Sequence, residues 1–250
     1  MNPNAVKVLW QRQFKKYIRS KARIIGSLGQ PLLFLLVFGM GFKNVFSAAG
    51  KGNYIELLAP GIIVMSVVFT AVFSGIEVIW DRQFGFLKET LVAPVSRFSI
   101  MFGKTLGGAT VSALQGVIIF FVTLLVGLKV SSVFGVISGF IGLFILGALF
   151  SAFGILLASR LEDMQAFPII MNFVIMPIFF LSGTLFPIDG SPKMLKIISI
   201  MNPLSYGVDF VRGSFTGIFY FNPSLDIMIM LISTIVVVFL GSVFFNKVQA

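Results

Sequence analysis

Six long apolar runs decide what this chain can fold into. All 19 Lys and Arg and all nine Asp and Glu residues lie outside these runs. A helix needs about 20 apolar residues to cross a bilayer, so each run is long enough to span one. We therefore predict an all-α membrane protein, in which residues 1–250 form a single domain with six transmembrane helices. The predicted spans are residues 24–42, 57–76, 105–128, 133–158, 164–186 and 227–245.

The composition narrows the possible functions. Hydrophobic residues make up 57% of the chain and charged residues 11%, whereas about 25% is usual for charged residues in a soluble domain. His and Cys are absent, which removes the usual metal ligands and the usual nucleophile–base pairs. We expect no bound metal or cofactor and no enzyme activity. The runs also lack the ionisable groups of proton relays, so the energy source is expected on another polypeptide.

Residues 4–23 are predicted to form an amphipathic helix at the membrane surface. Apolar side chains recur at the i, i+3, i+4 spacing from Val6 to Ile18, and most Lys and Arg residues lie off that face. A basic helix of this kind binds among anionic headgroups, and an ordinary solvated helix is the alternative. Because the cations flank apolar runs, the net charge of +10 does not indicate a nucleic-acid partner.

The distribution of Lys and Arg predicts the orientation in the membrane. Seven lie before the first run and four between the second and third runs, with Arg160 and Lys247 on the same side. The opposite side has only Lys43, Lys51, Lys129, Lys193, Lys196 and Arg212. Positive charges concentrate in cytoplasmic segments, so we predict that both termini are cytoplasmic.

Two connecting segments are predicted to contain short helices. In segment 81–104, residues 87–92 form a helical candidate that would suit a groove on a partner, and a plain connector is the alternative. In the outer connection, Ser191-Pro192 and Asn202-Pro203 each place an N-cap residue before a Pro. The apolar residues behind each pair predict two short helices half-buried in the outer leaflet.

Aromatic and Met side chains within the runs could line an adaptable apolar pathway for a substrate, because Met repacks easily. Lipid-facing or packing roles are the alternative. Pro168 and Pro177 remove backbone donors from the fifth run, which makes it a candidate for a mobile or cavity-facing element. Small residues four apart, such as Gly103 and Gly107, favour close helix packing within the chain over a subunit contact. The pathway candidates are Met65, Phe69, Phe73, Phe173, Met176 and Phe180.

An ordered set of short motifs resembles a known family over nearly the whole chain. The motifs are YIELLAPG at 54–61, ETLVAPVSR at 89–97, FLSGTLFP at 180–187 and NPLSY at 202–206. In this order and spacing they resemble the permease subunits of ABC-2 type exporters, especially the daunorubicin-resistance-like branch. The set is more specific than any single motif.

The resemblance implies partners and roles that the spacing alone does not show. It implies a dimer with a second copy or a related permease, and separate ABC-type subunits that bind ATP and Mg. It implies re-entrant helices over residues 187–213. The residues implied to contact the ATPase are Gly85, Phe86, Leu87, Lys88, Glu89, Thr90, Leu91 and Pro94. The residues implied at the outer gate are Pro187, Asn202, Pro203 and Tyr206.

We therefore expect the permease subunit of an ATP-driven exporter in the cell membrane. Because the runs carry no charge, the expected substrate is hydrophobic or amphipathic, such as a drug-like molecule or a lipid. The alternatives are a polysaccharide or glycolipid exporter, a non-transporting membrane scaffold, a self-contained channel or secondary transporter, and an enzyme acting on lipids.

Overall fold

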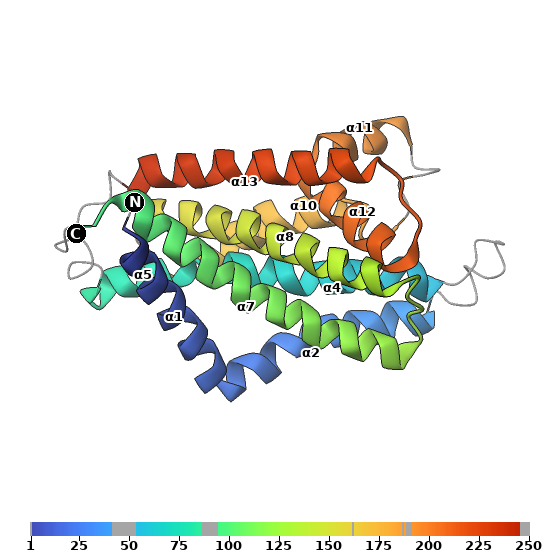
Figure 1. Ribbon diagram of the computed structural model, residues 1–250, viewed down its shortest axis with the longest axis horizontal. Coiled ribbons are helices and arrows are strands. Elements are labelled where there is room, and N and C mark those ends of the chain that lie inside the picture. Colours follow the sequence, from blue (N-terminus) through green and yellow to red (C-terminus); the bar gives the residue numbers. More distant parts are fainter. Residues whose placement is uncertain are drawn as a thin grey trace.

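The computed structural model describes residues 2–41, 54–86, 95–161, 163–186, 188 and 192–245, and this part of the chain contains helices and no strands. The long helices run roughly along one axis of the molecule (Figure 1). In chain order the helices are α1 (Pro3–Arg19), α2 (Lys21–Gly41), α4 (Tyr54–Phe73), α5 (Ile76–Gln83), α7 (Arg97–Val126), α8 (Val133–Arg160), α9 (Ala166–Ile170), the π-helical η1 (Met171–Ile175), α10 (Met176–Phe180), α11 (Lys193–Met201), α12 (Pro203–Thr216) and α13 (Pro223–Phe245).

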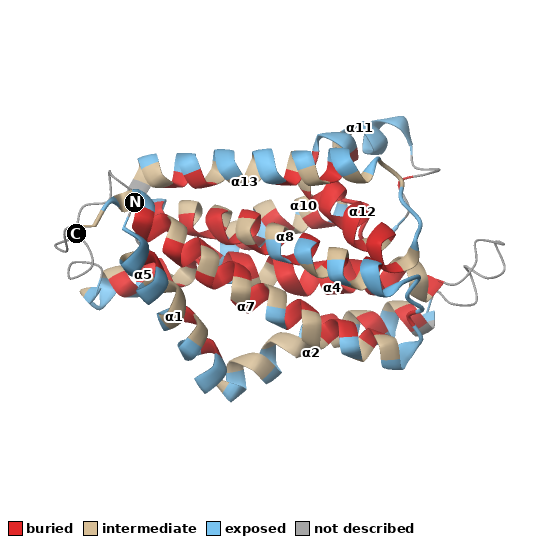
Figure 2. Cartoon of the chain, in the orientation of Figure 1, coloured by how far each residue is buried: buried red, intermediate tan, exposed pale blue. Residues whose placement is uncertain are grey.

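Helix α4 forms the centre of the bundle. It packs against α7, α8, α2 and α12, and most of its residues are buried. Helices α2 and α13 lie at the periphery and expose apolar side chains on their outer faces (Figure 2). Among the described residues, five helices are long and apolar enough to cross a membrane. The prediction of an all-α membrane protein is confirmed.

The fifth predicted span differs in form from the others. Residues 164–186 were predicted as a span with backbone donors lost at Pro168 and Pro177, and Ala166–Phe180 is a shorter apolar helix interrupted by η1. Pro177 has no N–H to donate to the carbonyl one turn before it, and this lost bond accompanies the wider π turn. The backbone therefore departs from a regular α-helix in the middle of this element.

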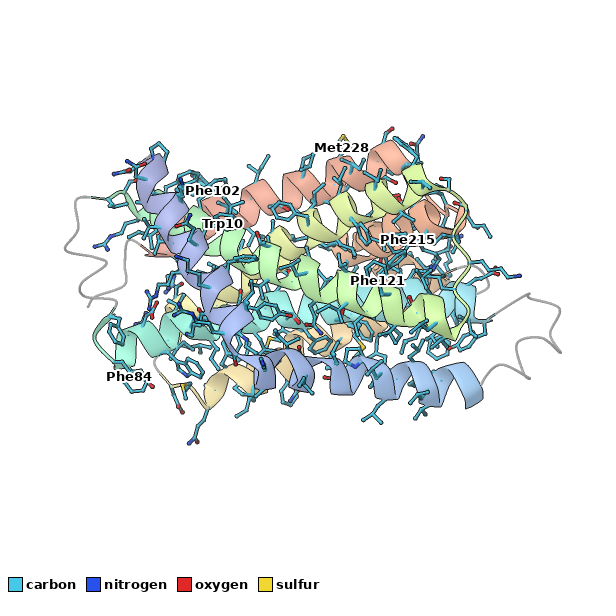
Figure 3. All side chains as sticks on the ribbon, turned by 60° about the horizontal axis from the view of Figure 1, so that its bottom comes forward. Trp10, Phe84, Phe102, Phe121, Phe215 and Met228 are labelled. Carbon is cyan, nitrogen blue, oxygen red and sulfur yellow. The ribbon has the colours of Figure 1, made fainter. Side chains whose placement is uncertain are left out.

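Helix α1 crosses one end of the bundle and packs on α7 (Figures 1 and 3). Trp10 Nε1 donates to Thr110 Oγ1 at 2.9 Å, and the Tyr17 hydroxyl donates to Gln115 Oε1 at 2.5 Å. The apolar face of α1 therefore packs against α7. The side chains of Val8 and Ile18 are not covered by the protein and remain exposed. The predicted helix at 4–23 ends at Arg19, and α2 begins at Lys21.

Small residues let the helices approach closely within the chain, as predicted. A side chain at Gly103 would meet Val6 and Leu9 of α1, and one at Gly107 would meet Gln13. A close crossing joins the α4–α5 junction to α8, where Gly75 lies against the backbone of Gly154. This crossing fixes the position of α5.

Gly75→Ala is expected to lower the free energy of unfolding by about 2 kcal/mol, because its Cβ would overlap the backbone of α8 rather than a flexible side chain. Thermal unfolding in lipid nanodiscs measures the change. Gly29→Ala on α2 is the matched control, because its Cβ would meet nothing within 4 Å. Ala favours a helix over Gly by up to about 1 kcal/mol, so this control is expected to be neutral or stabilising. Equal effects of the two substitutions would contradict the close crossing.

Candidate functional site

A buried ion-pair cluster joins three helices at the end of the bundle where α1 begins and α13 ends (Figure 1). Asp81 of α5 accepts from Lys104 Nζ of α7 at 2.5 Å and from Arg12 Nη2 of α1 at 2.9 Å. Lys104 is only 3% exposed and Asp81 only 6%. The sequence placed Lys104 in a connecting segment, but α7 begins at Arg97 and carries Lys104 into the bundle. The cluster ties α5 to both neighbouring helices.

Further polar contacts hold α5 in place. Glu77 accepts from Arg23 Nη1 at 2.8 Å, and Lys16 Nζ lies 3.6 Å from the same carboxylate. Arg82 donates to the carbonyls of Leu161 and Ser159 at 3.1 and 3.0 Å. These bonds supply partners for backbone carbonyls that lack one at the end of α8. Helix α5 is therefore linked to α1, the start of α2, α7 and α8 by charged groups.

A cavity of about 670 Å³ lies between the α1–α2 elbow and α4–α5. Three of the predicted pathway residues line it: Met65, Phe69 and Phe73. Lys16, Arg23 and Glu77 also line it, so the cavity has charged groups that the apolar runs themselves lack. An apolar wall with a few charged side chains is typical of a site for an amphipathic small molecule.

The other three pathway candidates do not line this cavity. Phe173 and Phe180 are 79% and 47% exposed, and Met176 lies on the same interrupted element. Aromatic contacts nevertheless join α4 to the interrupted element through other residues of that element. Phe69 meets Phe179 at 6.0 Å between ring centroids, and Phe73 meets Phe167 at 6.1 Å.

At the opposite end, α11 and α12 hydrogen-bond to the end of the interrupted helix. Asn202 Nδ2 donates to the Ile178 carbonyl at 2.6 Å, and Ser199 Oγ donates to the Leu181 carbonyl at 2.6 Å. Asn202 Oδ1 also accepts from Leu204 N at 3.0 Å, so Asn202 is the N-cap of α12, as the Asn-Pro pair predicted. Helix α11 begins at Lys193, one residue later than its predicted start at Pro192.

Buried charges at this end were not predicted from the sequence. Arg212 Nη2 donates to the Gly183 carbonyl at 2.7 Å, and Asp209 accepts from the backbone N–H groups of Tyr220 and Phe221. Burial lowers the pKa of Arg212 to about 10, although Asp209 acts in the opposite direction, so the guanidinium stays charged at neutral pH. Asp226 is 0% exposed at the start of α13. The sequence predicted the two short helices at this end, but no local pattern indicated these buried charges.

Several predicted site residues can be placed and others cannot. Gly85 adopts a positive φ of 78°, which suits the turn after α5, and Phe86 is 51% exposed. Asn202, Pro203 and Tyr206 come together at the start of α12, where the Tyr206 hydroxyl donates to the Ile200 carbonyl at 2.7 Å. The predicted residues Leu87, Lys88, Glu89, Thr90, Leu91, Pro94 and Pro187 lie outside the described residues.

Arg212→Gln is expected to lower the free energy of unfolding by about 1.5 kcal/mol, because the charge-assisted bond to the Gly183 carbonyl is lost. Thermal unfolding in nanodiscs measures the loss, with the exposed Lys193→Gln on α11 as the control for charge alone. A loss no larger than that of the control would contradict a structural role for Arg212.

The sequence is similar to a known family of membrane proteins and to individual transport permeases. The model of the ABC-2 type transporter family matches residues 4–216. The chain is 32% identical over 208 residues to the transport permease ycf38 of Cyanophora paradoxa, covering 82% of this chain and 72% of the relative. It is 27% identical over 212 residues to Nodulation protein J of Rhizobium leguminosarum bv. viciae, covering 84% and 81% of the two chains. It is 24% identical over 217 residues to the inner membrane transport permease YadH of Escherichia coli K12, covering 86% and 84%.

The chain belongs to the ABC-2 type transporter family. Members of this family are non-catalytic membrane subunits of transporters, and the family implies a partner subunit that binds ATP. The expected resemblance to ABC-2 permeases is therefore confirmed, and this protein is a transport permease.

Proposed function

We propose that this chain is the permease subunit of an exporter that moves an amphipathic substrate and is driven by a separate ATPase. The single observation that supports this most strongly is the position of α5 and α7. They flank the family's implied ATPase contact at residues 85–94, and the Asp81 cluster joins them to α1. A displacement of residues 85–94 would therefore reach α1, α4 and the cavity through rigid elements rather than through a loose connection.

Nucleotide drives transport in this proposal by changing the relative stability of two permease states. An ATPase pair that binds one state more tightly than the other shifts the equilibrium by that difference in affinity. ATP and Mg would be held by the partner, and this chain would supply the substrate route. Met65, Phe69 and Phe73 would line its inner part, and Phe173, Met176 and Phe180 would face a second permease, either another copy or a related chain.

The region around Asn202, Pro203 and Tyr206 would form the outer gate, together with Pro187. Hydrogen bonds from Asn202 to the Ile178 carbonyl of α10 and from Ser199 to the Leu181 carbonyl just after it support this, because they couple movement of the interrupted helix to α11 and α12. The element would bend at the π turn of η1, since such turns break the regular hydrogen-bond ladder.

We propose that the chain lies in the cell membrane with both termini in the cytoplasm. The start of α1, the end of α13 and α5 lie at one end of the bundle, and α11 and α12 lie at the other (Figure 1). The end that contains α1 and α5 is also the end rich in Lys and Arg, which favours the cytoplasmic side.

Site-specific cross-linking tests the proposed contact with the ATPase. The chain has no Cys, so one introduced Cys gives one attachment point. Lys88→Cys, modified with a photoreactive reagent in native membranes, is expected to capture a soluble ATP-binding chain. Met194→Cys on α11 is the matched control and is expected to capture none. Capture from both positions, or from neither while other neighbours are captured, would contradict the proposed contact.

A further inference from the structure

The cavity between the α1–α2 elbow and α4–α5 has two chemically different sides. Lys16 and Arg23 lie on the side formed by α1 and α2, whereas Met65, Phe69 and Phe73 form an apolar side on α4. Its volume of about 670 Å³ falls within the range of roughly 300–1,000 Å³ that small-molecule sites occupy. The cavity is therefore large enough for the head and the upper chain of one amphiphile.

The charged side carries more positive than negative charge. Glu77 is 7% exposed, and both cations direct their nitrogen atoms at its carboxylate. The Lys16 and Arg23 side chains are 44% and 31% exposed, so they remain within reach of a ligand. A guanidinium has five N–H donors and an ammonium three, so each can bind an anion and hold Glu77 at the same time.

Trp80 adds a third feature to the charged side. Lys16 Nζ lies 5.3 Å from the centroid of the Trp80 ring, a cation–π distance that holds the ammonium beside the cavity. The cation is thus positioned by one aromatic ring and one carboxylate before any ligand binds. A site arranged in advance loses less free energy when the ligand is ordered.

We propose that this cavity binds a single-chain amphiphile with an anionic, phosphate-like head group. Lys16 and Arg23 would hold the head group, because a guanidinium matches the geometry of phosphate oxygens. The apolar chain would lie along Phe69 and Phe73. The inference rests on the proposed transport function, since it names the chemical class of the substrate and its first binding site.

Fluorescence of Trp80 tests the proposal directly. The chain has two Trp residues, and Trp10 does not line the cavity, so Trp10→Phe leaves Trp80 as the reporter. The probe is dodecyl phosphate brominated on the chain carbons nearest the head group, where the proposed pose places them close to Trp80, and it is added to the protein in phosphatidylcholine nanodiscs. We expect saturable quenching, with affinity at least about tenfold higher than for brominated dodecyl maltoside or dodecyl trimethylammonium.

Charge-removing variants separate the cavity from the general basic surface. Lys16→Gln and Arg23→Gln are each expected to weaken dodecyl phosphate binding about tenfold and to leave maltoside binding unchanged. Lys15→Gln and Arg19→Gln are the matched controls, because both cations lie on α1 outside this cavity. Equal losses in all four variants, or equal binding of the three probes, would overturn the proposal.

Ligand binding in nanodiscs and co-purification of an ATPase from native membranes together distinguish this inference from the proposed function. If an ATPase co-purifies but phosphate binding is not selective, the cargo class is wrong and the transport function stands. If phosphate binding is selective but no ATPase is found, the binding site stands and the ATP-driven function is wrong.

Discussion

Asp81→Asn is expected to destabilise the protein by about 3 kcal/mol, because it leaves the buried Lys104 ammonium without its counter-ion. The substitution also breaks the link from α5 to Arg12 of α1. Removing one partner of a buried pair costs more than the pair contributes, since the remaining charge stays desolvated. Thermal unfolding in nanodiscs measures the loss of stability. The amount of ATPase that co-purifies with the variant shows whether α5 still positions residues 85–94 for the proposed contact.

Two further variants separate the buried pair from the loss of a negative charge alone. Asp163→Asn removes a carboxylate from the exposed turn before α9 and is expected to change the unfolding temperature little. Asp81→Asn combined with Lys104→Met removes both buried charges and is expected to recover most of the stability. If the double variant is as unstable as Asp81→Asn, the desolvated Lys104 is not the cause.

Leu87→Ala combined with Glu89→Lys is expected to reduce ATP-driven transport at least tenfold while the unfolding temperature stays the same. The change removes bulk and reverses a charge in the segment proposed to seat in the ATPase, and an interface loses most of its affinity when a central anchor is removed. The described helices contact one another without this segment, so we expect the bundle to stay intact.

Uptake of a fluorescent anionic amphiphile by inside-out vesicles measures transport by the double variant. Leu195→Ala on the exposed surface of α11 is the control, because it removes the same bulk at the opposite end. Normal ATP-driven uptake by the double variant would show that residues 87–89 do not couple the ATPase to the permease.

The fold follows closely from the apolar pattern because a bilayer permits few alternatives. A charge-free run of about 20 residues satisfies its backbone only as a helix when it lies in lipid. The Asn202-Pro203 start of α12 was also predictable, because capping depends on neighbouring residues alone. The spacing of Gly103 and Gly107 predicted close packing within the chain, but not that α1 would be the helix packed there.

Features that depend on distant partners were not predictable. Lys104 looked like the last residue of a loop, and its burial needs Asp81 and Arg12, which come from two other helices. The cavity likewise combines side chains from α1, α2, α4 and α5, so no local spacing signals it. Met65, Phe69 and Phe73 line the cavity on α4, and the pathway role of all six candidates, Phe173, Met176 and Phe180 included, remains a prediction.

Identification of the partner chain tests the central claim most directly. The protein would be solubilised gently from its native membrane, purified, and the chains that accompany it identified by mass. The proposed function predicts a soluble chain in stoichiometric amount that carries a phosphate-binding loop and hydrolyses ATP. Purification without any nucleotide-binding chain, under conditions in which the permease stays folded, would contradict an exporter driven by a separate ATPase.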